Sequence, residues 1–415
     1  MSLSLDRRQF IRLAGLTALT ATVPAFLHKT GLVLAGQARQ QPNPLPGLKD
    51  NHVLVIVQLA GGNDGLNTLV PYADDVYYKL RPRLGIAPQK VLRLDDRVGL
   101  HPEMIELHKL FNDGGLAVVP NVGYPNPSRS HFRATDIWET ASPADRMWKT
   151  GWVGRYFDAE CKGTPGAMLG LRLGEQAALT FAGEQARAAT LANPSLLEVP
   201  AKGALAKGLD AMTQVEPTGI EALDFIQRTG NETHTLAQRL KAVVRDVKPA
   251  VEYPPFALCQ SLRLVAQMIV AEVPTRVFYV TLGGFDTHSA QLNRHAGLLQ
   301  ELSQALSLFR RDLQAQGHLD RVLLMTFSEF GRRAAENKQL GTDHGTGNVM
   351  FLLGGKVKPG VHGAPPDLTK LDAEGDPFFK VDFRSVYAGV LRDWLNADAE
   401  RILAGKFEPL ALVQK

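Results

Sequence analysis

Five short polar clusters combine acidic, imidazole and hydroxyl side chains with glycine: "GGNDG", "GYPNPSRSH", "GGFDTH", "FSEFGR" and "GTDHGTG". They supply six candidate metal ligands, which are Asp64, Asp286, His288, Glu329, Asp343 and His344. Carboxylates that converge without a cation repel one another and raise each other's pKa, so this set favours bound metal. Mixed oxygen and nitrogen donors suit Zn, Mn, Fe or Mg, and the pattern does not distinguish these from Ca. We therefore predict a site for one or two divalent ions.

Each cluster taken alone has a simpler interpretation. An acid after Gly-Gly is common in turns, where it bonds to its own backbone. Glu329 could pair with Arg332 or Arg333, and His288 or His344 could be a buried structural histidine. The metal hypothesis therefore rests on the occurrence of Asp-x-His and Asp-His in the same chain, beside the other acids.

The elements that must position these clusters are strands alternating with helices. Continuous apolar runs such as "HVLVIVQLA", "RVFYVTL" and "RVLLMTF" are typical of strands buried on both faces, and helical periodicity separates them. This alternation predicts an α/β fold, with a mainly parallel sheet and helices on both faces. Four clusters directly follow a predicted strand, and "GTDHGTG" precedes the last one. Because ligands bind at the carboxyl ends of parallel strands, we expect the clusters to meet at one edge.

The N-terminal segment differs from the rest of the chain. "DRRQFIRLAGLTALTATVPAFL" places an arginine pair before a short, weakly apolar run, as in a twin-arginine export signal; an amphipathic helix is the alternative. We expect a signal peptide over residues 1–38, a linker over 39–51, and one domain over 52–415 with a helical cap or insertion at about 157–251. The protein would then be periplasmic or extracellular, delivered by the twin-arginine export machinery, with no stable membrane span in its mature form.

The net charge bears on whether the protein binds nucleic acid, and the two cysteines bear on whether it contains a disulfide. Residues 1–38 hold four basic residues and one acid, so their removal lowers the formal net charge from +4 to about +1. No basic run remains, which argues against a nucleic-acid partner. Cys161 and Cys259 could form a disulfide in an oxidising compartment, or Cys259 could be a packed thiol on a buried helix.

Five motifs in order resemble those of a secreted bacterial family known as domain of unknown function 1501. They are "GGNDGLNTLVP", "NPSRSHFRATDIW", "GGFDTHSAQ", "FSEFGRR" and "GTDHGTGNVMFLLGG", and the resemblance runs from about residue 52 to the C-terminus. That family is grouped with the alkaline-phosphatase-like superfamily of phosphatases, sulfatases and phosphoglycerate mutases. The resemblance implies an alkaline-phosphatase-like fold, two divalent metals held at strand ends, and a small anionic ester as substrate.

The candidate ligands correspond only partly to that superfamily. Asp64 resembles the acid after the first strand, and His344 resembles the last metal histidine. Asp286 and His288 resemble an Asp/His pair, although relatives usually space the pair as Asp-x-x-x-His. Glu329 stands where relatives often have Asp-His-Gly, so the neighbouring histidine is lost.

The segment "NPSRSH" resembles the Cys-x-Pro-Ser-Arg segment of sulfatases, with Pro125 in the place of the modified cysteine. Ser128 or Ser130 could act as the nucleophile at a helix start, or could simply cap that helix. Arg129 could bind a substrate oxyanion in bidentate fashion, or could pair with an acid on the same helix.

These observations predict an exported metal-dependent hydrolase or transferase that acts on phosphate or sulfate esters. The departures from the superfamily pattern leave an alternative of a different class. A catalytically degenerate relative could keep the fold and a structural metal, and could bind or assemble with another exported protein.

Overall fold

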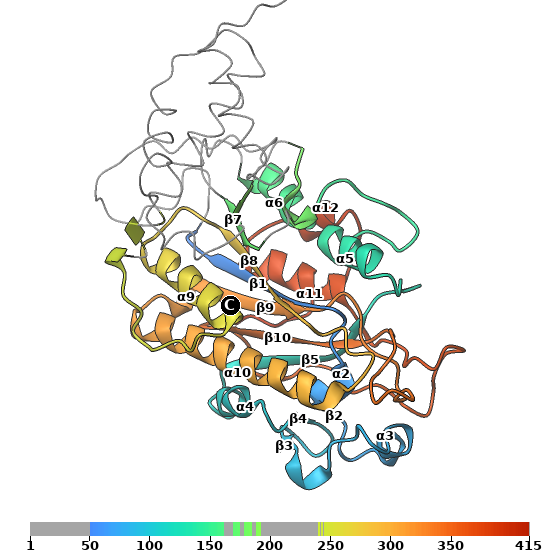
Figure 1. The fold of residues 1–415 in the computed structure, drawn as a ribbon. Helices are drawn as coiled ribbons and strands as arrows, with labels where there is room; N and C mark the ends of the chain where they lie inside the picture. The colour runs from blue at the N-terminus through green and yellow to red at the C-terminus, as the bar shows by residue number, and fades with distance from the viewer. Residues whose placement is uncertain are drawn as a thin grey trace, which may run out of the picture.

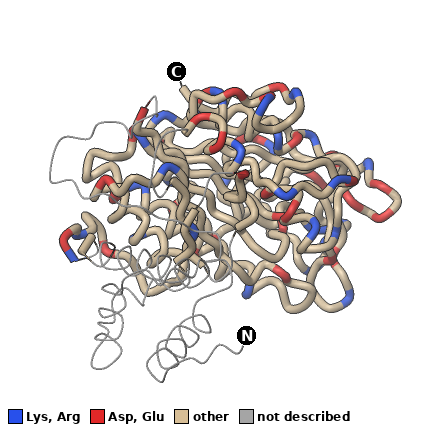
Figure 2. The backbone as a smooth tube through the Cα atoms, turned by 90° about the horizontal axis from the view of Figure 1, so that it is seen from above, with Lys and Arg blue, Asp and Glu red and all other residues tan. Residues whose placement is uncertain are grey.

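The computed structural model describes residues 50–161, 169–174, 178–184, 188–191, 240, 242–243 and 245–414. The predicted signal peptide, nearly all of the predicted linker and much of the predicted insertion lie outside the described residues. Within the described part, no helix is long and apolar enough to span a bilayer. Basic and acidic residues are interspersed over the described backbone (Figure 2).

A nine-stranded sheet organises the described part of the chain (Figure 1). Its order is β11-β5-β10-β9-β1-β8-β6-β7, with β12 also paired to β5. The strands are β1 (Val53–Ala60), β5 (Leu116–Gly123), β6 (Gly170–Leu173), β7 (Ala188–Leu191), β8 (Val277–Gly283), β9 (Val322–Phe327), β10 (Asn348–Gly354), β11 (Gly360–Val361) and β12 (Val381–Asp382). Every pairing is parallel except those of β10 with β5 and β9. The predicted mainly parallel sheet is confirmed.

Helices cover both faces of this sheet, as predicted (Figure 1). One face carries α4 (Ile105–Asn112), α9 (Ala257–Val270) and α10 (Gln291–Ala315). The other carries α5 (His131–Thr140), α6 (Trp152–Glu160), α11 (Phe383–Gly389) and α12 (Ala399–Leu403). Strand β1 shows why its sequence is apolar throughout: Val55 and Val57 enter one core, and Leu54 and Ile56 enter the other.

Smaller elements complete the described structure. They are α2 (Gly65–Thr68), α3 (Asp75–Leu80), a small sheet of β2 (Leu69–Val70), β4 (Gly99–Leu100) and β3 (Leu92–Arg93), 3₁₀ turns at Pro88–Lys90, Leu179–Phe181 and Leu319–Arg321, and a π-helical turn at Val390–Trp394. The described pieces of the predicted helical insertion include two strands of the main sheet, β6 and β7. Cys161 and Cys259 are buried in opposite cores and no disulfide joins them.

Strand register aligns the ends of the three central strands. Ala60 of β1 lies opposite Gly283 of β8, and Gln58 of β1 lies opposite Phe327 of β9. The segments that leave β1, β8 and β9 therefore emerge at one edge of the sheet.

The antiparallel strand β10 explains the fifth cluster. It begins at Asn348, opposite Val122 near the end of β5, so its amino end lies where the parallel strands finish. The cluster over residues 341–347 comes just before this strand and reaches the same edge. All five polar clusters are thus positioned by strand ends at a single edge.

Candidate metal centre

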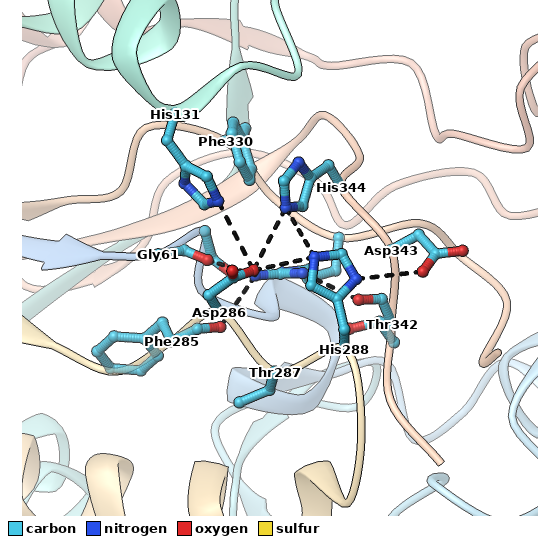
Figure 3. A network of polar contacts seen from close by, with 12 residues as sticks. Gly61, His131, Phe285, Asp286, Thr287, His288, Phe330, Thr342, Asp343 and His344 are labelled. Carbon is cyan, nitrogen blue, oxygen red and sulfur yellow. Dashed lines mark hydrogen bonds and ion pairs between the residues drawn. The ribbon is translucent and has the colours of Figure 1, made fainter. Parts of the chain in front are cut away.

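Three imidazoles surround one carboxylate oxygen at this edge (Figure 3). His131 opens α5, Asp286 and His288 follow β8, and His344 precedes β10. The Nε2 atoms of His288, His344 and His131 lie 3.0, 3.3 and 3.6 Å from Asp286 Oδ1. Four nitrogen and oxygen donors from three separate segments therefore face one another.

In two of these histidines, Nδ1 lies within hydrogen-bond distance of an acceptor oxygen on the side of the ring away from Asp286. His131 Nδ1 lies 2.8 Å from Glu329 Oε1. His344 Nδ1 lies 2.8 Å from the carbonyl oxygen of Arg129. Since carboxylate and carbonyl oxygens accept hydrogen bonds, Nδ1 carries the proton in each neutral ring and leaves the Nε2 lone pair facing the centre. This arrangement is characteristic of metal-binding histidines.

His288 is held in the same way on the solvent side. Its Nδ1 lies 3.3 Å from Asp343 Oδ1, and Asn337 Nδ2 donates to the same oxygen at 3.1 Å. The His288 side chain is 44% exposed and that of Asp286 is 47% exposed. The centre therefore opens to solvent beside His288, whereas Glu329 closes it from behind with a side chain only 3% exposed.

The donor spacing fits a divalent ion. Ligand atoms around a tetrahedral ion with bonds of ~2.1 Å lie ~3.4 Å apart. The ligand atoms of His131, Asp286 and His344 all lie within 4.8 Å of one another, and two of the separations are 3.3 and 3.6 Å. His288 Nε2 lies 2.9 Å from His344 Nε2. Two lone pairs at that distance repel, and either a proton on one of the rings or a bound cation relieves the repulsion.

Electrostatics keeps the carboxylate charged. Partial burial alone would raise the pKa of Asp286, but the hydrogen bond and charge of Arg332 lower it to about 2. The hydrogen bond to Glu329 raises the pKa of His131, whereas burial lowers the pKa of His344. Asp286 is therefore ionised, and ready to bind a cation, at any ordinary pH.

Two glycines permit the close approach of these segments. Gly61 has φ +115°, and a Cβ there would lie 2.4 Å from the backbone nitrogen of Asp286. A Cβ on Gly341 would lie 2.2 Å from the carbonyl carbon of His288. Glycine is therefore required at both positions, because any side chain would push apart the segments that carry the donors.

The predicted ligands occupy three kinds of position. Asp286, His288 and His344 converge on the centre. Asp343 contacts the outer nitrogen of His288. Glu329 contacts the outer nitrogen of His131 and accepts a 2.8 Å hydrogen bond from the Gly61 N–H. The geometry thus favours a role for Asp343 and Glu329 in orienting the histidine rings.

Asp64 lies in a separate, closed arrangement. Its Oδ2 accepts hydrogen bonds from Arg81 Nη1 at 2.6 Å and Gln291 Nε2 at 2.5 Å. Its Oδ1 caps α2 by accepting from the N–H groups of Leu66 and Asn67. The side chains of Asp64 and Arg81 are both fully buried. With four donors already on the carboxylate, the geometry favours a structural role for Asp64.

The predicted catalytic residues lie on the segment that enters α5. Ser130 is the N-cap residue of α5, but its side chain makes no capping hydrogen bond. Ser128 Oγ accepts a weak hydrogen bond from the Ser130 N–H at 3.3 Å. Arg129 pairs with Asp376 through Nε at 3.0 Å and with Asp372 at 3.5 Å, so its acidic partners come from a distant loop.

His131 is the residue that the sequence reasoning missed. It stands in the cluster "GYPNPSRSH", beside the serines that were singled out. Its place at the start of the predicted helix, in a polar cluster that follows a predicted strand, is the signal that could have identified it.

Comparison with curated proteins gives no match. Among solved structures, the chain is similar to a protein in the alkaline phosphatase superfamily from Vibrio parahaemolyticus, with 10% identity, TM-score 0.40, and coverage of 98% of this chain and 80% of that one. It is also similar to the C-terminal periplasmic domain of EcEptC from Escherichia coli in complex with Zn, with 12% identity, TM-score 0.36, and coverage of 74% and 73%. A third is the sulfatase PsFucS1 from Pseudoalteromonas sp., with 10% identity, TM-score 0.34, and coverage of 99% and 78%. At this level of similarity, nothing about the activity or ligands of these proteins can be transferred to this chain.

A family model gives a firmer result. The model described as "Protein of unknown function (DUF1501)" matches residues 51–385, which is most of the chain and includes every polar cluster of the sheet edge. The family predicted from the five motifs is confirmed: the chain belongs to the DUF1501 family.

Proposed function

We propose that the protein is an exported metal-dependent enzyme that hydrolyses or transfers phosphate or sulfate esters. One observation carries the proposal: three imidazole Nε2 atoms face Asp286 Oδ1, and each outer ring nitrogen has its own oxygen partner. Such an arrangement of imidazoles and a carboxylate suits Zn or another first-row divalent ion.

His131, Asp286 and His344 would hold the ion, with His288 as a fourth donor on the exposed side. A divalent ion bound there would polarise the ester oxygens and stabilise the negative charge that develops on them. The exposure of Asp286 and His288 gives an ester access to the centre from solvent.

Ser130 is the nucleophile that the geometry favours. It occupies the N-cap position of the ten-residue helix α5, but its hydroxyl makes no capping hydrogen bond. The first N–H groups and the positive dipole end of this helix favour an anionic group. His131 follows Ser130 directly, so the hydroxyl and a metal donor lie on neighbouring residues. In the proposed reaction Ser130 Oγ bonds to phosphorus or sulfur as the ester alcohol leaves with a proton. Water, or an acceptor alcohol in a transfer, then displaces the serine.

The site of action is proposed from the N-terminal pattern. Arg7 and Arg8 before a weakly apolar run support export by the twin-arginine machinery into the periplasm or beyond. That segment lies outside the described residues. A small anionic ester in that compartment would be the substrate.

A second candidate function is that of a metal-stabilised binding or assembly partner of another exported protein. Arg129, predicted to orient the substrate, pairs instead with Asp376 and Asp372, which favours this alternative. The enzyme should turn over an ester substrate, whereas the binding or assembly partner should not.

The test is an assay of metal-loaded protein against aryl phosphate and aryl sulfate esters, with Ser130→Ala and the matched control Ser128→Ala. We expect turnover by the wild type, retention of metal by both variants, and loss of at least about 1000-fold in kcat for Ser130→Ala only. Equal turnover by Ser130→Ala would remove Ser130 from the mechanism. No turnover on any ester by the metal-loaded wild type would support the binding partner.

A further inference from the structure

Arg332 is a buried cation that follows β9, and its side chain is fully enclosed. Its guanidinium donates to four backbone carbonyl oxygens and one carboxylate. The acceptors are Gly62 O (2.6 Å, from Nε), Thr342 O (2.9 Å, from Nη1), and Gly61 O, Phe285 O (3.0 Å) and Asp286 Oδ1 (2.8 Å), all three from Nη2.

These acceptors come from three of the clusters at the sheet edge, namely those that follow β1, follow β8 and precede β10. The backbone of Arg332 adds a further connection, because it forms a β-bridge with His344. The next residue, Arg333, donates its N–H to the Asp343 carbonyl at 3.0 Å. One residue therefore contacts Asp286 through its side chain and His344 through its backbone.

Charge accounts for the particular role of Asp286. A buried guanidinium without a counter-charge is costly, because it loses its hydration. Among the five acceptors of Arg332, only Asp286 Oδ1 is charged. This same oxygen is the one that the three histidine Nε2 atoms face. The oxygen that balances the charge of Arg332 is therefore the same oxygen that the histidines of the candidate metal centre face.

The planar guanidinium fixes that atom in position. Its fork of N–H donors is rigid, and the four carbonyl bonds leave it no freedom to rotate. A lysine would keep the charge, but its three N–H donors could not satisfy all five acceptors.

We propose that Arg332 is a positioning residue of the metal centre, which holds Asp286 Oδ1 at the point where the three histidine Nε2 atoms meet. The inference rests on the metal centre of the proposed function, and Arg332, being fully enclosed, does not touch the substrate.

Loss of the contact leaves Asp286 free to turn away from the histidines. Residues that orient a metal ligand in this way typically contribute a factor of about 10–100 in metal affinity.

The test compares Co²⁺ binding by the wild type, Arg332→Lys and the matched control Arg333→Lys. Arg333 is the neighbouring arginine, and its side chain pairs with the exposed Glu374. Affinity is measured by competition with a chelator, and the visible spectrum of bound Co²⁺ reports the coordination geometry. We expect an affinity about 10–100-fold lower and an altered spectrum for Arg332→Lys, and wild-type values for Arg333→Lys.

A second variant covers the case in which Arg332→Lys does not fold. Asp286→Glu leaves the four carbonyl bonds of Arg332 intact but shifts the carboxylate by one methylene. If Arg332 fixes that oxygen, we expect Asp286→Glu to lower Co²⁺ affinity about 10-fold or more and to alter the spectrum.

The outcomes separate the two proposals. Wild-type affinity and spectrum in Arg332→Lys or in Asp286→Glu would overturn the positioning role and leave the metal centre standing. A wild type that binds no Co²⁺ would overturn both.

Discussion

Two groups of acid, histidine and arginine side chains lie near the end of β1, and they differ in how their polar atoms are satisfied. In the open group, three histidine Nε2 atoms face Asp286, whose side chain is 47% exposed. In the closed group, Asp64 and Arg81 form a fully buried ion pair, and Gln291 also donates to the Asp64 carboxylate. The same residue types therefore form a candidate metal centre in one place and a buried ion pair in the other. The two groups differ in exposure: the histidine Nε2 atoms of the open group face a half-exposed carboxylate, whereas the ion pair of the closed group is fully buried.

The histidines show the same contrast. The closed group also includes His295 and His101, which lie near Asp64 with ring centroids 6.1 Å apart. His295 Nε2 lies 3.0 Å from Asn63 Oδ1, so its ring nitrogen donates to an amide oxygen. Burial lowers the pKa of His295 to about 3, whereas the hydrogen bond to Glu329 raises the pKa of His131 in the open group. A neutral buried ring suits a structural network, and a ring oriented by a carboxylate suits a metal donor.

Removing a donor from the open group should have the largest effect on function. For His344→Ala we expect loss of at least about 100-fold in affinity for Zn²⁺ and turnover at background. The loss should exceed that of an orienting residue, because His344 is proposed to bind the ion directly. The free energy of unfolding of the metal-free protein should change by less than about 1 kcal/mol, because the ring is partly exposed. Chelator competition and urea unfolding measure the two quantities. Unchanged Zn²⁺ affinity would contradict the assignment of His344.

Removing the acid of the closed group should act on stability. Asp64→Ala leaves Arg81 buried without its counter-charge, which should cost about 3–5 kcal/mol in urea unfolding. The fraction that folds should still bind metal. Asp343→Ala is the matched control, because that carboxylate is half-exposed and should cost below about 1 kcal/mol. A stable Asp64→Ala protein without metal would instead make Asp64 a ligand.

Glu329 should behave as part of the open group although it is buried. Glu329→Gln weakens the contact that orients His131 Nδ1, so metal affinity should fall about 10–100-fold. Isothermal titration of the metal-free protein would measure it. An affinity loss as large as that of His344→Ala would indicate that Glu329 binds the ion directly.

The histidines of the closed group should make the free energy of unfolding fall gradually as the pH is lowered. Burial lowers the pKa of His295 to about 3 and that of His101 to about 4, below the ~6.5 of an unfolded histidine. The unfolded state therefore binds more protons between those values, and the free energy of unfolding falls as pH drops below 6.5. Each histidine contributes a slope of up to about 1.4 kcal/mol per pH unit. Urea unfolding between pH 7.5 and 4.5 should show a smaller slope for His295→Gln, and an equal slope would contradict the account.

The sequence was sufficient to predict the central strands of the sheet, because strands buried on both faces must be apolar throughout. It did not predict β6 and β7, which lie in the region expected to be a helical insertion. The run "VLVIVQLA" forms β1 where expected, and the helices alternate with strands as predicted. The direction of β10 could not be predicted, since it depends on how the chain returns to the sheet and not on local pattern.

The candidate site could be predicted in part. Asp286, His288 and His344 stand in conspicuous clusters and do converge. The pairing of Asp64 with Arg81 could not be predicted, because it joins residues 17 positions apart that share no periodicity. Which acids bind and which ones orient depends on side-chain packing, and a motif does not specify that.

The most direct test of the metal centre is the metal content of wild-type protein and of Asp286→Asn, both purified without chelator. The account predicts about one equivalent of a divalent ion in the wild type and a large loss in Asp286→Asn. Less than about half an equivalent in the wild type, unchanged in Asp286→Asn, would contradict it.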